Sequence, residues 1–264
     1  MNKVSQERIK HRERPGKKVK RKTVDPREKK DPAEEEKRKR LKEKLAEIGI
    51  LSFQQIRDMM LVQHKDNYGW EIRTERDLSG VEKFSEYCFK NGFFQVPNQE
   101  FVLALASHLQ GKKVLEIGAG NGVLAVGLRA CGVDIIATDD LSWEESGENA
   151  LYLVEDLDYK GALEKYGDRI DVVICSWMPR GEDWMPEIFA VDPRKVIAIG
   201  ELGHEGTYGT GKLIERTWEG DWTNYPGRRT KKLTAVSKYS TCHNDTYANS
   251  DHSYAVSIEK IEEE

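Results

Sequence analysis

Short apolar runs alternate with longer periodic segments from about residue 94 to residue 260. Apolar runs of four to seven residues are typical of strands buried on both faces, and longer periodic segments are typical of helices. The pattern predicts strands over 114–117, 133–139, 151–154, 170–176 and 195–201. Helices are predicted between them, over 101–109, 122–131, 159–166, 183–190 and 211–218.

Alternation of strands and helices predicts an α/β fold whose sheet is mainly parallel and covered by helices on both faces. Two further strands, 231–240 and 252–260, are separated by a polar stretch without a helical pattern. Consecutive strands with no helix between them predict an antiparallel pair at the C-terminal end of the sheet. The expected sheet therefore has seven strands, most of them parallel.

The chain before residue 94 has a different character. Residues 1–32 contain three prolines, one glycine and almost no large apolar side chain. They are therefore expected to remain disordered. Good helix formers follow, and the pattern predicts helices over 33–48, 52–62 and 81–89. We expect three parts: a basic tail, a helical extension and a main domain, over 1–44, 45–93 and 94–264.

Composition excludes some classes of protein. Of 264 residues, 33% are charged and 38% hydrophobic, and no apolar run approaches the roughly 18 residues that a membrane helix needs. The first residues lack the apolar core of a secretory signal. The four cysteines are scattered, which is typical of a reducing compartment. These features predict a cytoplasmic protein with no membrane contact.

Charge is distributed unevenly along the chain. Residues 1–44 hold 19 Lys and Arg against 9 Asp and Glu, a net charge of +10, whereas the remaining residues hold 23 against 37. A basic tail with almost no aromatic side chains would contact the phosphates of RNA or DNA without reading their sequence. A solubilising extension is the alternative, because glutamates are interspersed among the basic residues.

The segment 112–124 reads KKVLEIGAGNGVL and places three glycines directly after a predicted strand. Glycines at a strand–helix turn allow the backbone to approach a ligand closely. A dinucleotide-binding loop would have its third glycine where this chain has Val123. Glu116, two residues before the loop, would repel a pyrophosphate but attract a ligand that carries an ammonium and a sulfonium.

VLEIGAGNG resembles the first motif of class I S-adenosylmethionine-dependent methyltransferases. The resemblance covers roughly residues 94–260 and implies a Rossmann-like fold with S-adenosyl-L-methionine as cofactor. It assigns Asp139, with Asp140 beside it, to the ribose hydroxyls, and Asp158 or Asp156 to the adenine. The remaining expected cofactor contacts are Glu116, Gly118, Ala119, Gly120, Asn121 and Gly122. Residues 95–98 are expected over the amino-acid end of the cofactor. The alternative is that Asp139 and Asp140 only cap the next helix.

The fourth strand ends in CSWMPRGEDW, where such enzymes position the acceptor. Methyltransferases that act on exocyclic amines carry two prolines and an aromatic residue here. This chain has one proline followed by Arg180, which argues against methylation of a nucleic-acid base. The segment is similar to a methyltransferase-like family that has SWPPY here and VIYIGE on the next strand. Ser176, Trp177 and Glu201 are therefore the candidate catalytic residues, although Trp177 could form only a wall and Glu201 only a helix cap.

Three other interpretations carry less weight. Cys242, His243 and His252 have no fourth ligand nearby, so no metal is expected. A nicotinamide dehydrogenase is disfavoured by Val123 and Glu116. A catalytically silent module that keeps the fold and binds nucleic acid or a protein is the main alternative to an enzyme.

Overall fold

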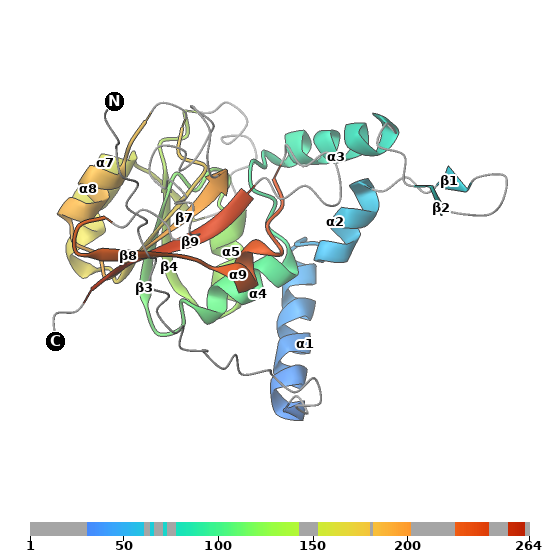
Figure 1. The fold of residues 1–264 in the computed structure, drawn as a ribbon, viewed down its shortest axis with the longest axis horizontal. Coiled ribbons are helices and arrows are strands. Elements are labelled where there is room, and N and C mark those ends of the chain that lie inside the picture. Colours follow the sequence, from blue (N-terminus) through green and yellow to red (C-terminus); the bar gives the residue numbers. More distant parts are fainter. Residues whose placement is uncertain are drawn as a thin grey trace, which may run out of the picture.

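A computed structural model represents the chain, and Figure 1 shows its fold. The residues that it describes are 31–60, 64–65, 71–72, 78–142, 153–179, 182–201, 225–242 and 253–261.

A seven-stranded sheet forms the centre of the molecule, with the strand order β5-β4-β3-β6-β7-β9-β8. The strands β3 to β7 are parallel to one another, while β9 is antiparallel to both β7 and β8. This arrangement confirms the predicted α/β fold with an antiparallel C-terminal pair. The strands are β3 (Lys113–Ile117), β4 (Asp134–Asp139), β5 (Val154–Asp156), β6 (Val172–Ser176), β7 (Lys195–Glu201), β8 (Arg228–Lys232) and β9 (Ser253–Lys260).

Helices cover both faces of this sheet (Figure 1). Along β6, Val172 and Ile174 point into one core, whereas Val173 and Cys175 point into the other, as the period of two in a strand requires. The first core lies under α4 (Gln99–Ser107), α5 (Val123–Ala130) and α9 (Thr234–Ser237). The second lies under α7 (Tyr159–Tyr166) and α8 (Met185–Ala190).

The chain starts its sheet at β3, moves outward through β4 and β5, and then returns to place β6 on the other side of β3. In such sheets a ligand binds beyond the carboxyl ends of the strands where this reversal occurs. The reversal between β3 and β6 therefore locates the candidate site at the ends of β3, β4 and β6.

The N-terminal part contains α1 (Pro32–Glu47), α2 (Phe53–Met60) and α3 (Leu78–Asn91). Between α2 and α3 are two short antiparallel strands, β1 (His64–Lys65) and β2 (Glu71–Ile72). Leu45 of α1 and Ile50, just after this helix, are buried in the first core, and Leu41 of α1 packs against it. A Cβ atom built on Gly127 of α5 would lie 2.8 Å from Ile50, so the two segments touch without intervening side chains.

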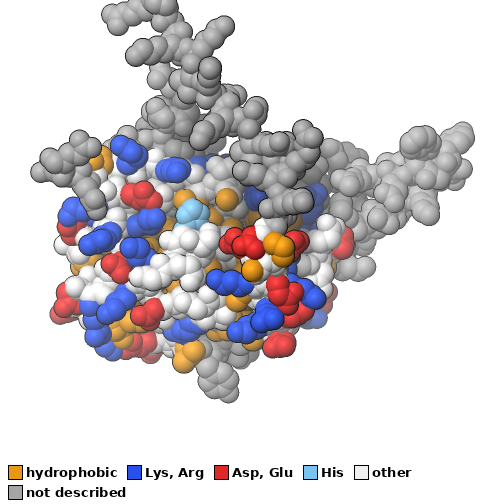
Figure 2. Space-filling view, turned by 90° about the horizontal axis from the view of Figure 1, so that it is seen from below, with side chains coloured by type: hydrophobic (Ala, Val, Ile, Leu, Met, Phe, Trp, Pro, Cys, Tyr) orange, Lys and Arg blue, Asp and Glu red, His pale blue; other side chains and the backbone are white. Residues whose placement is uncertain are grey.

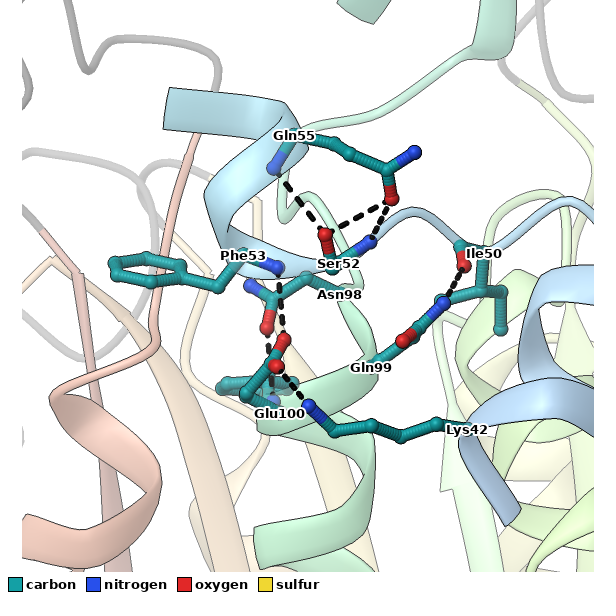
Figure 3. Close-up of polar contacts among 9 residues, drawn as sticks. Lys42, Ile50, Ser52, Phe53, Gln55, Asn98, Gln99 and Glu100 are labelled. Atoms are coloured by element: carbon teal, nitrogen blue, oxygen red, sulfur yellow. Dashed lines mark hydrogen bonds and ion pairs between the residues drawn. The ribbon is translucent and has the colours of Figure 1, made fainter. Parts of the chain in front are cut away.

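Polar contacts hold the same helices to the start of α4 (Figure 3). The Glu100 carboxylate accepts hydrogen bonds from the Lys42 ammonium of α1 and, at 2.7 Å, from the backbone N–H of Phe53 in α2. The Gln99 amide donates to the carbonyl of Ile50 at 2.9 Å. These bonds attach α1 and α2 to α4. The residues directly before α4 lead into the candidate site.

Two predicted elements differ from the observed ones. The third strand begins at Val154, because Leu153 adopts a positive φ of 103° in a turn. The segment 231–240 is not one strand: β8 ends at Lys232, and the short helix α9 follows. Leu233 and Val236 are both buried, and their spacing of three residues suits a helical turn.

Several predictions fall outside the described residues. They concern the disorder of 1–30 within the predicted 1–32, the helix 211–218, Arg180, and the histidines at 243 and 252. Pro32, by contrast, is described and begins α1. The division of the chain into three parts also stays a prediction. In the part of the chain that the structure describes, no helix has both the length and the apolar character required to cross a membrane.

Replacement of Leu45 by alanine tests the attachment of α1. Leu45 is fully buried, so Leu45→Ala should lower the free energy of unfolding by about 2–5 kcal/mol in urea denaturation. Lys39→Ala, on the exposed surface of the same helix, is the matched control and should change it by less than about 0.5 kcal/mol. Equal stability of both variants would contradict the packing of α1 on the core.

Candidate active site

A glycine bend connects β3 to α5. Gly118, Gly120 and Gly122 have φ angles of 64°, 55° and 76°, a region that side chains with a Cβ atom rarely adopt. A Cβ atom on Gly118 would lie 3.0 Å from the Trp184 ring, whereas one on Gly120 would meet nothing within 4 Å. The bend is therefore closed by an aromatic ring at one glycine and open at the next.

Asp139 at the end of β4 holds this bend in place. One of its carboxylate oxygens accepts from the N–H of Gly120 at 2.7 Å, and the other accepts from the N–H of Leu141 at 2.9 Å. The N–H of Ala119 also donates to the carbonyl of Thr138 at 3.0 Å. Burial raises the pKa of Asp139, the two N–H donors oppose the rise, and the nearby carboxylates add to it.

Glu116 is the most unusual ionisable group of the site. Its side chain is 1% exposed, and one of its carboxylate oxygens is buried without a hydrogen-bond partner. Burial, followed by the charge of Asp139, raises the pKa of Glu116 to about 8, against a smaller opposing effect of Arg129. A buried carboxylate with an orphaned oxygen is costly unless a donor or a cation completes it.

A cavity of about 950 Å³ opens in front of these residues. Its walls come from the bend, the ends of β4 and β6, the start of α7, and the segment that leads from α3 into α4. It brings together most of the predicted site residues, namely Glu116, Gly118, Ala119, Gly120, Asn121, Asp139, Asp140, Asp158, Ser176 and Trp177.

The remaining predicted residues lie elsewhere. Gly122 is the N-cap of α5 and is not among the residues of the cavity wall. Glu201 ends β7 opposite Ser253 of β9, and its side chain is outside the described part of the structure. Asp156, the alternative to Asp158, pairs with Asp139 along β5 and is not among the residues of the cavity wall.

Two of the predicted aspartates also stabilise turns. Asp158 is the N-cap of α7 and accepts from the N–H of Gly161 at 2.7 Å. Asp140 accepts from the N–H of Ser142 at 3.0 Å and from its hydroxyl at 2.7 Å. Both side chains are exposed, so their remaining lone pairs are accessible to a ligand.

Ser176 and Trp177 lie at the carboxyl end of β6. Trp177 has a positive φ of 56°, which is rare for a bulky side chain. Its indole N–H donates to the Gln95 amide oxygen at 3.1 Å, and its ring lies 6.2 Å from that of Phe94. The predicted acceptor position is thus bordered by aromatic rings.

The sequence did not predict several residues of the cavity wall. Trp184 stacks on Tyr159 with ring centroids 4.7 Å apart, and its indole N–H donates to Glu182. Phe89 and Phe93 of the α3 region also line the cavity. Trp184 belongs to the segment CSWMPRGEDW but was not among the candidate residues, because only the tertiary fold brings it and the phenylalanines to the bend.

Among the described residues of the wall there is no Lys, Arg or His, and five side chains carry a carboxyl group: Glu116, Asp139, Asp140, Asp158 and Glu182. A low-dielectric cavity lined by carboxylates concentrates cations and repels anions. The described wall therefore suits a positively charged ligand and disfavours a pyrophosphate.

Comparisons with known proteins agree with this geometry. Residues 90–178 match a family model described as a methyltransferase domain, and this segment contains the bend, Asp139 and Trp177. No curated protein sequence matches the chain. Residues 90–178 are therefore similar to a methyltransferase domain, in agreement with the resemblance found in the sequence.

Solved structures of low sequence identity resemble this one. A proposed RNA methyltransferase from Pyrococcus horikoshii is 18% identical, with a TM-score of 0.36 over 86% of this chain and 100% of its own. The methyltransferase domain of METTL16 is 11% identical, with a TM-score of 0.39 over 80% and 89%. A SAM-dependent methyltransferase from Bacteroides fragilis, in complex with S-adenosyl-L-homocysteine, is 14% identical, with a TM-score of 0.30 over 61% and 77%. At these values the likeness carries no information on the acceptor.

The raised pKa of Glu116 predicts a pH-dependent cost to the folded chain. Below pH 4.5 the group is neutral in both states, but between about 4.5 and 8 the unfolded chain ionises it first, so stability is lost as pH rises. Glu116→Gln should therefore gain stability relative to the unmodified chain, by on the order of a few kcal/mol between pH 5 and pH 8. Chemical denaturation at several pH values measures this difference.

The exposed Glu164→Gln variant on α7 is the control for this comparison. It should track the unmodified chain at every pH. A Glu116→Gln variant that does the same would show that the carboxylate ionises without cost in the folded protein.

Proposed function

We propose that the chain transfers a methyl group from S-adenosyl-L-methionine to an acceptor. The observation that carries this proposal is the buried Glu116 carboxyl group, which lines the cavity and has one oxygen without a partner. An ammonium or sulfonium in the cavity would favour its ionised form and so lower its raised pKa. A dinucleotide would instead bring a pyrophosphate against the same carboxylate.

The residues present fit this cofactor. The open space at Gly120 allows main-chain atoms to contact a ligand, and a side chain at that position would fill it. Asp139 uses one of its approximately four lone-pair sites on the bend and one on the N–H of Leu141, and keeps others for ribose hydroxyls. Asp158, at the start of α7, is the proposed contact on the adenine side.

The cofactor supplies a methyl group that is already activated for displacement, so the protein mainly has to position the reactants and exclude water. Ser176 and Trp177 at the end of β6 are the proposed acceptor-side residues, together with Glu201 at the end of β7. Aromatic faces such as those of Phe94 and Trp177 can stabilise a cationic group that approaches the cavity. The acceptor itself follows from none of these contacts.

A catalytically silent module is the alternative function. It would bind nucleic acid or a protein through the same fold without turnover. The strained Trp177 and the costly Glu116 argue against it, because a module that binds no cofactor gains nothing from either.

Nucleic acid remains a proposed partner of the basic tail. Residues 1–30 contain 13 Lys and Arg against 4 Asp and Glu, so they hold most of the positive charge of 1–44. Within α1, opposite charges pair along the helix, as between Arg40 and Glu36 at 3.2 Å. Figure 2 shows Lys and Arg interspersed with Asp and Glu over the face that it presents. Residues 1–30 are therefore the part of the chain best suited to contact phosphates.

Removal of a cofactor contact should weaken binding of S-adenosyl-L-methionine. Isothermal titration calorimetry should show a loss of more than about tenfold for Asp139→Ala and for Gly120→Val, which fills the open space at the bend. The control is Asp134→Ala, at the exposed start of the same strand, with unchanged affinity.

The Glu116→Gln variant tests the pH dependence of cofactor binding. The affinity of the unmodified chain divided by that of Glu116→Gln should rise from pH 6 to pH 8, and the titration of the ligand cancels in this ratio.

Transfer is tested by incubating the chain with radiolabelled methyl donor and fractionated cell extract. Label should enter one class of acceptor (RNA, protein or small molecules) with the unmodified chain and not with Asp139→Ala. Binding without incorporation in any fraction would favour the silent module. Unchanged calorimetric affinity in all site variants would refute the proposed site.

Deletion of residues 1–30 tests the role of the tail. This deletion leaves α1 and its Lys42 contact intact, so the fold and the affinity for the methyl donor should not change. Fluorescence anisotropy with a labelled single-stranded RNA should show weaker binding by about tenfold or more at low salt, with a flatter salt dependence. Unaltered RNA affinity would contradict the proposed contact with RNA and support the alternative that the tail is only a solubilising extension.

A further inference from the structure

Gln95 connects three parts of the structure through its side-chain amide. It is 7% exposed and lies on the wall of the cavity, just before α4. Its oxygen accepts from the Trp177 indole N–H at 3.1 Å, and its nitrogen donates to the Ser240 hydroxyl at 3.0 Å. The Ser240 hydroxyl is 2.7 Å from that of Ser253, at the start of β9. The amide thus links the end of β6 to the antiparallel side of the sheet.

Trp177, the partner of Gln95, is held in a costly backbone conformation. A bulky residue at a φ of 56° costs of order 1–3 kcal/mol and persists only where the surroundings fix it. Two contacts with described residues contribute to this: the Trp177 backbone N–H donates to the carbonyl of Ile199 at 2.8 Å, and its indole N–H is bonded to Gln95. Strain of this kind is concentrated at functional sites.

We propose that Gln95 is a positioning residue that fixes the Trp177 indole as an aromatic wall of the acceptor half of the cavity. This inference rests on the proposed methyl transfer. The indole has a single N–H, and because Gln95 accepts it, Trp177 does not use that proton to bind an acceptor. Trp177 therefore contributes its ring, beside the ring of Phe94, to orienting the acceptor.

The amide of Gln95 is bonded within the protein at both ends, to Trp177 and Ser240. It keeps a second N–H, so the expected contact of residues 95–98 with the amino-acid end of the cofactor stays a prediction. The proposed role of Gln95 takes no part in the chemical step. In that step a lone pair of the acceptor bonds to the methyl carbon, the carbon–sulfur bond breaks, and its electron pair stays on sulfur as the cofactor becomes a neutral thioether.

Alignment of acceptor, methyl carbon and sulfur is the quantity that Gln95 would control. A misplacement of about 1 Å can reduce the rate of an aligned reaction by roughly 100-fold. An indole released from Gln95 could rotate and widen the acceptor site. The expected loss is therefore in turnover, while the cofactor, held by the bend and Asp139, binds as before.

The experiment compares Gln95→Met, which keeps the length of the side chain but loses the amide, with Ser240→Ala. The second variant keeps the bond from Gln95 to Trp177 and removes the Ser240 hydroxyl with its contacts to Gln95 and Ser253, so it is the matched control. Donor affinity is measured by calorimetry. Turnover is measured as initial incorporation of label over a series of concentrations of the acceptor-containing extract fraction. The Trp177 indole ¹⁵N–¹H signal reports its hydrogen bond.

Gln95→Met should lower maximal incorporation by roughly 10-fold to 100-fold and shift the indole signal, with donor affinity within about twofold. Ser240→Ala should change incorporation by less than about threefold and leave the indole signal in place. In a Trp177→Phe background, which has no indole N–H, Gln95→Met should cause little further loss.

Equal incorporation by Gln95→Met and the unmodified chain would overturn this inference alone. The inference is also overturned if Gln95→Met and Ser240→Ala reduce incorporation and donor affinity to the same extent, which is the result of a merely structural role. Failure of the unmodified chain to bind the donor or to incorporate label would instead overturn the proposed function, and this inference with it.

Discussion

The hydrogen bond from the Gly120 N–H to the Asp139 carboxylate is the contact on which the site depends. The bend needs three glycines at positive φ, and such a loop has little packing of its own to fix it. Asp139, at the end of the neighbouring parallel strand, binds the middle glycine and the N–H of Leu141. One carboxylate therefore sets the shape of the bend and remains close enough to contact what the bend would hold.

The N-terminal helices complete this site although they lie outside the sheet. Asn98 caps α4 by accepting from the N–H of Phe101, and its amide donates to the carbonyl of Tyr239. Because Glu100 and Gln99 hold α1 and α2 on the same helix, the chain that enters α4 is fixed on several sides (Figure 3). That fixed segment carries Gln95, and α3 before it supplies further residues of the cavity wall.

The sequence predicted those parts of the structure whose signals are local. The glycine bend, Asp139 and the succession of buried strands along the chain can each be inferred from a few adjacent residues. The β8 strand could not, since its alternation of buried and exposed residues consists of Arg, Thr and Lys rather than of apolar side chains. Trp184 and Tyr159 were missed for another reason: their place at the bend depends on how α7 and α8 pack.

Glu116 and Trp177 show the same trade-off between stability and function in different forms. A buried carboxylate without a full set of partners and an aromatic residue at positive φ both cost stability in the free protein. Both face one cavity, where a cationic ligand would offset the first cost and an oriented acceptor would make use of the second. A sequence selected only for stability would keep neither, and so their joint presence at the ends of β3 and β6 is best explained by a reaction that takes place between them.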